Sequence, residues 1–109
     1  MRTSALLGAC LLAAASSAFA ASPAPIAVVI KNHRFVPAEI VVPAHMAVQL
    51  QVTNQDPLAE EFDSTALKVE KVIAGGDTGT VRLRPLAPGR YPFIGEYHAG
   101  TAKGVVISR

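Results

Sequence analysis

Apolar and polar residues alternate with a period of two along most of this chain, as is typical of β-strands with one buried face. The clearest cases are Val48-Gln49-Leu50-Gln51-Val52 and Val81-Arg82-Leu83-Arg84. Further β-rich runs cover residues 26–31, 39–42, 46–53 and 103–108. Turn-forming residues separate the runs, at Pro37, Pro43, 54–57, 75–77, Pro88-Gly89 and Gly100. Short strands with regular breaks predict an all-β sandwich or small barrel.

One stretch leaves its secondary structure open. Residues 64–71, STALKVEK, can form a single helical turn with Ser64 as N-cap, or a strand-like crossing. No other segment beyond the N-terminal leader has a helical pattern.

The first twenty residues have the composition of an export signal. A cation at Arg2 precedes an apolar run over 5–15, and Ala18-Phe19-Ala20 is the small-x-small pattern before a cleavage site. The run is too short to span a bilayer as a retained helix. We therefore expect a signal peptide over 1–20 and a mature, periplasmic domain over 21–109, without membrane insertion.

Cys10 raises the alternative of a lipoprotein, because Leu7-Gly8-Ala9-Cys10 matches a lipidation box. The segment before it is very short, however, and the apolar run continues past it, so cleavage after Ala20 is the expectation. Cys10 is the single cysteine of the chain. The mature domain then has no disulfide and depends on its core alone.

Charge argues against two classes of partner. Removal of Arg2 from ten Lys and Arg leaves nine cations against eight Asp and Glu. A domain so close to neutral is not expected to bind nucleic acid or an anionic membrane surface.

The order of the pieces resembles the cupredoxin family over the whole mature chain. Four fragments carry the resemblance: Phe35-x-Pro37-x-x-Ile40-x-Val42-Pro43, Asn54-x-Asp56 followed by Glu61-Phe62, Pro85-Leu86-x-Pro88-Gly89-x-Tyr91-x-Phe93, and Lys103-Gly104-x-Val106. The resemblance implies a Greek-key β-sandwich.

It also implies that a blue-copper site has been largely replaced. Such a site needs two imidazoles and a thiolate, usually with an axial thioether. At the matching positions this chain has Glu60 for the first histidine, Gly95 for the cysteine and Ala102 (or Thr101) for the methionine. His98 alone is retained. We therefore expect no type 1 copper and no blue-copper electron transfer.

The replacing residues still offer metal ligands. We take His98, Glu60, Glu96, Glu61 and Asp63 as candidate metal ligands, because imidazole and carboxylate together suit Fe(II), Mn(II) or Zn(II) and accept Cu(II). The residues leave other interpretations open. His98 can serve packing, the adjacent glutamates can form a solvated face, and strand alternation can point Glu96 away from the site. His33 and His45 are expected at the surface.

Two motifs, Glu60-Glu61-Phe62-Asp63 and Gly95-Glu96-Tyr97-His98, resemble the periplasmic cupredoxin-like proteins that accompany bacterial ferrous-iron permeases. The resemblance implies handling of Fe²⁺ (or Cu²⁺) for a membrane iron permease or another periplasmic component of the same system. The alternative is a metal-free scaffold that acts as a protein-interaction module. A ferroxidase-type enzyme is a third hypothesis, for which the sequence shows no electron acceptor.

Overall fold

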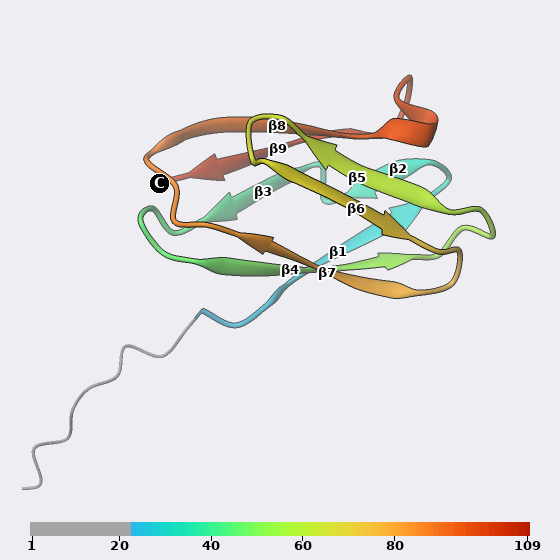
Figure 1. Ribbon diagram of the computed structural model, residues 1–109, viewed down its shortest axis with the longest axis horizontal. Coiled ribbons are helices and arrows are strands. Elements are labelled where there is room, and N and C mark those ends of the chain that lie inside the picture. The colour runs from blue at the N-terminus through green and yellow to red at the C-terminus, as the bar shows by residue number, and fades with distance from the viewer. Residues whose placement is uncertain (1–22) are drawn as a thin grey trace, which may run out of the picture.

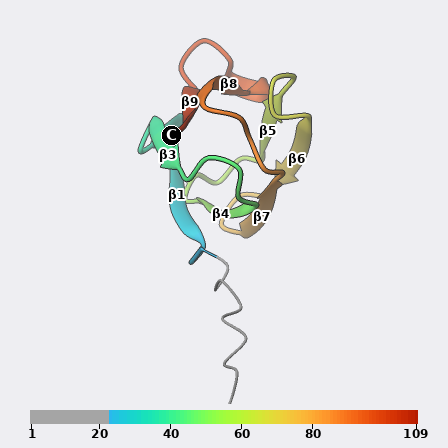
Figure 2. The same cartoon turned by 90° about the vertical axis from the view of Figure 1, so that its left-hand side faces the viewer.

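The computed structural model describes residues 23–109, which form two β-sheets packed face to face (Figures 1 and 2). The signal peptide expected over 1–20 and Cys10 lie outside the described residues. One sheet has the order β2 (Arg34–Val36), β1 (Ile26–Lys31), β4 (Val48–Asn54), β7 (Thr78–Leu83). The other has the order β3 (Glu39–Val42), β9 (Lys103–Ser108), β8 (Gly89–Gly95), β5 (Glu60–Ser64), β6 (Val69–Ile73).

Both sheets mix parallel and antiparallel pairs. β1 runs parallel to β4 and β3 parallel to β9, whereas the other pairs are antiparallel. The chain passes repeatedly from one sheet to the other, which confirms the expected all-β Greek-key sandwich. In the described range a single 3-10 turn, η1 (Glu96–His98), is the only helical element, and no helix there is long and apolar enough to cross a membrane.

The core forms where the alternating strands turn their apolar residues inward. Val48, Leu50 and Val52 of β4 are buried, as the pattern predicts. At the end of the sandwich that carries η1, Phe35 packs edge-on against Phe62 and Phe93, which stack on each other with ring centroids 4.6 Å apart. These three rings form an aromatic cluster in the core at this end of the sandwich.

The structure settles one segment that the sequence left open and corrects the expectation for another. The stretch 64–71 is not helical: Ser64 ends β5, residues 65–68 form a turn, and β6 begins at Val69. The resemblance places residues 59–62 in a loop, but residues 60–64 form strand β5, in which Glu60, Phe62 and Ser64 are buried and Glu61 and Asp63 half-buried. Polar residues at two of the three inward positions hid the period of two.

Candidate metal centre

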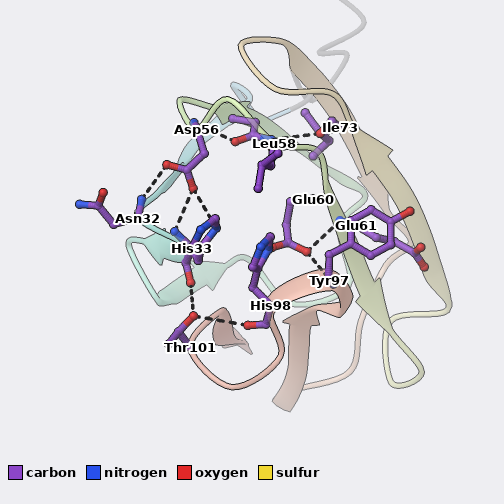
Figure 3. A network of polar contacts seen from close by, with 11 residues as sticks. Asn32, His33, Asp56, Leu58, Glu60, Glu61, Ile73, Tyr97, His98 and Thr101 are labelled. Atoms are coloured by element: carbon purple, nitrogen blue, oxygen red, sulfur yellow. Dashed lines mark hydrogen bonds and ion pairs between the residues drawn. The ribbon is translucent and has the colours of Figure 1, made fainter.

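Three loops that are distant in the sequence meet at one end of the sandwich (Figures 1 and 3). They are the β1–β2 turn, the segment 55–59 before β5, and the segment 96–102 after β8. Hydrogen bonds join them in pairs: the Gln55 amide donates to the Ile30 carbonyl at 2.8 Å, and the Thr101 hydroxyl donates to the His33 carbonyl at 2.7 Å. The end of the sandwich is therefore one connected unit.

Asn54, at the end of β4, shapes the middle loop from inside. Its fully buried side chain donates to the Leu58 carbonyl at 2.8 Å and to the Ile73 carbonyl at 3.1 Å. Its Oδ1 accepts the Asp56 amide at 3.0 Å, a local turn typical of asparagine. All its polar atoms are thus satisfied, and the loop is held between β4 and β6.

Asp56 connects this loop to the β1–β2 turn. Its two carboxylate oxygens accept the backbone amides of Asn32, at 2.8 Å, and His33, at 2.9 Å. The His33 amide, and then that of Asn32, lower the pKa of Asp56, although burial acts in the opposite direction. The carboxylate is therefore held ionised against the turn, with the His33 ring nitrogen Nδ1 3.5 Å from Oδ2.

Glu60 is a buried carboxylate whose oxygens are all used. It is the first residue of β5, and strand alternation directs its side chain inward, where only 1% of the residue is exposed. Oε1 accepts the amides of Glu61 at 3.0 Å and Tyr97 at 2.9 Å, and Oε2 lies 2.6 Å from Nδ1 of His98. The last distance is that of a short hydrogen bond.

Gly95 makes room for this carboxylate. A Cβ placed on residue 95 would stand 2.7 Å from Cδ of Glu60 and 2.6 Å from Cβ of Ala102. Both distances are well inside van der Waals contact. The glycine and the small Ala102 are therefore what allow Glu60 to fill the space between β5 and η1.

His33 and His98 stack face to face beside Glu60, with ring centroids 3.7 Å apart and planes 13° apart (Figure 3). Nitrogen or oxygen atoms of His33, Glu60 and His98 all lie within 4.8 Å of one another. Two imidazoles and one carboxylate are a ligand set for Fe(II) and other divalent ions. An imidazole binds a metal in its own ring plane, so both rings can hold one ion only after they leave the parallel stack.

A second group of acidic residues lies on the outer face of the sheet that contains β5 and β6. Ligand oxygens of Glu61, Asp63 and Glu70 come within 4.8 Å of one another, and Asp63 stands opposite Glu70 in the β5–β6 register. Desolvation raises the pKa of the exposed Glu96, as do the charge and hydrogen bond of Asp63. Within residues 23–109 no Lys or Arg nitrogen lies within 4.0 Å of these four carboxylates.

The structure thus divides the five residues predicted from the sequence. It brings His98 and Glu60 together, and it places Glu61 and Asp63 on the other face, with Glu96 beside Asp63. His33 was expected at the surface, but it lies in the group, and 40% of its side chain is exposed. A strand-then-turn pattern at 26–36 could have located the hairpin, yet no local signal shows that this hairpin reaches His98. His45 is exposed, as expected.

A mixed Greek-key β-sandwich with potential metal-binding side chains gathered at one end is the architecture of a cupredoxin. The family model for the Cupredoxin-like domain matches residues 4–108, and the chain belongs to that family. The match begins inside the segment expected to be a signal peptide. A sequence relative, an uncharacterized protein of Rickettsia prowazekii, is 38% identical over 80 residues, which cover 73% of this chain and 64% of that protein.

Solved structures show the same fold at low sequence identity. The metal-binding domain of the Cu(I)-exporting ATPase CopA from Streptococcus pneumoniae, solved with Cu(I), aligns with TM-score 0.69 and 16% identity over 78% of this chain and 84% of that one. Auracyanin A, a blue copper protein of Chloroflexus aurantiacus, aligns with TM-score 0.67 and 16% identity over 81% and 100%. A purple cupredoxin of Nitrosopumilus maritimus has TM-score 0.60 and 16% identity over 77% and 99%.

The residues present do not fit a blue-copper centre. Such a centre needs a thiolate, and no cysteine occurs after Cys10. At residue 95, which the family resemblance assigns to the thiolate, even a Cβ would collide with Glu60. Within residues 23–109, the ligand atoms gathered at this end of the molecule are nitrogen and oxygen.

Proposed function

We propose that this protein is exported to the periplasm and handles a divalent metal ion, ferrous iron or Cu(II), for a membrane iron-uptake permease or another periplasmic component of that system. The observation that carries the proposal is the gathering of His33, Glu60 and His98 within 4.8 Å at one end of the fold. Sulfur is missing from the group, which favours ions of harder character than Cu(I).

The position of the group supports exchange of the ion. Side-chain exposure rises from 2% at Glu60 through 24% at His98 to 40% at His33, so an ion would be anchored inside and reached from outside. Leu58 and Tyr97, each more than half exposed, lie close by in the loops that carry Glu60 and His98 (Figure 3). These two side chains are the contacts that we propose for a partner.

Metal uptake by the protein recovered from the periplasm of an expression host tests the proposal. The N-terminal mass shows whether cleavage follows Ala20. Anaerobic Fe(II), and in parallel Cu(II), Zn(II) and Mn(II), are titrated in and their stoichiometry measured. We expect one ion per chain, lost in His98→Ala and in Glu60→Ala. Retention of the ion in both variants would move the site elsewhere.

The hydrogen bonds of Glu60 favour a second candidate, a metal-free interaction module. Three donors already satisfy this carboxylate, so the loops are held together without an ion. No uptake of any of the four ions would select this candidate. Its test is then a pull-down with the permease, comparing the wild type with Leu58→Ser and Tyr97→Ser.

A further inference from the structure

We propose that Asp56 is a positioning residue of the metal centre, which holds the Asn32–His33 turn so that the His33 imidazole lies against His98. The proposal rests on the function proposed above, but its first readout needs no metal. Asp56 is 8% exposed and belongs to neither of the two clusters of candidate ligands.

The turn that carries His33 is held by contacts from outside the β1–β2 hairpin. Asn32 and His33 both have positive φ, 52° and 56°, in a tight turn between β1 and β2. This conformation is uncommon outside glycine; asparagine and histidine adopt it more readily than most residues, and contacts around the turn add to its stability. The Asp56 carboxylate supplies such contacts, because it accepts both amides of the turn at once, at 2.8 and 2.9 Å.

A second contact holds the same residue from the opposite loop. The Thr101 hydroxyl donates to the His33 carbonyl at 2.7 Å, and the Ala102 and Thr101 amides bond to the His98 carbonyl. His33 is therefore held at its amide by the loop before β5, and at its carbonyl by the loop that carries His98. Loss of either contact should release the hairpin from the site.

Asp56 holds the backbone of the turn and leaves the His33 ring able to rotate. Both strong bonds of Asp56 go to amides, whereas its contact with the His33 ring is 3.5 Å long. Rotation about the Cβ–Cγ bond of histidine is soft. The ring can thus leave the stack to meet an ion while its Cα stays in place, so Asp56 preorganises the ligand without locking it.

The test combines two variants of Asp56 with a control of similar structural severity. Asp56→Asn keeps the shape but replaces one acceptor oxygen by an NH2 group, and Asp56→Ala removes both acceptors. The control is Ser64→Ala, at the far end of β5, which loses a bond to the Pro92 carbonyl and one from the Leu67 amide. NMR of the metal-free protein records the amide protons of Asn32 and His33 and the ring protons of both histidines.

In both Asp56 variants we expect the two amide signals to move upfield and the ring protons to lose the shifts that stacking produces. Zn(II) and anaerobic Fe(II) should bind about 10–100-fold more weakly, as on removal of other residues that orient metal ligands. Ser64→Ala should leave ring signals and affinity unchanged at an equal loss of stability. Thr101→Val, acting from the other side of His33, should reproduce the Asp56 result in a milder form.

Wild-type ring signals in Asp56→Asn would overturn the proposal, and so would an equal loss of affinity in Ser64→Ala. If the wild-type protein takes up no metal, the proposed metal function fails. The NMR comparison then still decides whether Asp56 places His33.

Discussion

Strand β5 presents carboxylates to two opposite environments, and their contrast explains much of the molecule. Glu60 points inward, where three donors surround it. Glu61 and Asp63, its near neighbours on the same strand, point outward, where their carboxylates come close to that of Glu70. One side chain of β5 thus joins loops together, whereas the outer pair adds repulsion. The same carboxylate group therefore has opposite effects on stability, depending on which face of β5 it occupies.

Removal of the inner carboxylate should have the largest effect on stability. Glu60→Ala leaves the amides of Glu61 and Tyr97, and Nδ1 of His98, without their acceptor, and should lower the free energy of unfolding by roughly 3 kcal/mol. The outer variant for comparison, Glu61→Gln, should stay within about 0.5 kcal/mol of the wild type. Urea unfolding measures both. Equal effects of the two variants would remove the contrast between the faces of β5.

Filling the space beside Glu60 should have the second-largest effect on stability. Gly95→Ala brings a Cβ within 2.7 Å of Cδ of Glu60, and such overpacking typically costs about 1–3 kcal/mol. Gly100→Ala is the control, because a Cβ there meets nothing within 4 Å. Thermal unfolding of both variants gives the comparison. A neutral Gly95→Ala would mean that Glu60 can leave its place easily.

Lowering the pH should destabilise the end of the sandwich that carries η1, because acid protonates Asp56. Its pKa in the folded protein is lowered from the usual 3.8. Ionised Asp56 therefore stabilises the fold above that value, and the contribution is lost as pH falls through the lower, folded pKa. Asp56→Asn should lower stability by roughly 2 kcal/mol at neutral pH, and its deficit should shrink toward pH 2. Urea unfolding across this range measures the deficit, and a constant deficit would contradict the assignment.

Relief of the outer repulsion should have the smallest effect, with the opposite sign. Asp63→Asn removes one of two like charges that face each other across β5 and β6, and should raise stability by about 0.2–1 kcal/mol at neutral pH. The raised pKa of Glu96 should fall toward its usual value of 4.5 in this variant. Glu96 repels its neighbours only when it is ionised. Its contribution to the gain in stability therefore falls as the pH drops through its raised pKa, and it is lost below 4.5. Carboxyl NMR titration, together with urea unfolding, checks both statements.

The sequence predicts the scaffold well because the scaffold depends on local alternation. The runs at 26–31 and 103–108 coincide with β1 and β9, and the pattern at 48–52 lies within β4. β5 escaped the pattern because an inward-pointing glutamate resembles a polar loop residue. Nothing local distinguishes a buried, fully bonded carboxylate from a solvated one.

The site is predictable only in part, since it is assembled from loops far apart in the chain. His98 and Glu60 could be paired through family resemblance, because both stand at positions that carry ligands in cupredoxins. His33 stands at no such position. It joins the site because the β1–β2 turn is tied to Asp56, a contact that spans 23 residues. Only the three-dimensional arrangement shows this contact.

The close fit between residue 95 and Glu60 also limits how a thiolate could be introduced at this end of the molecule. Cysteine at 95 could not simply be added, because the carboxylate already fills the volume into which its Cβ would extend. The glutamate would have to be exchanged for a different side chain in the same step, or before it. A protein engineer who wants a well-packed thiolate here would therefore change residues 60 and 95 together.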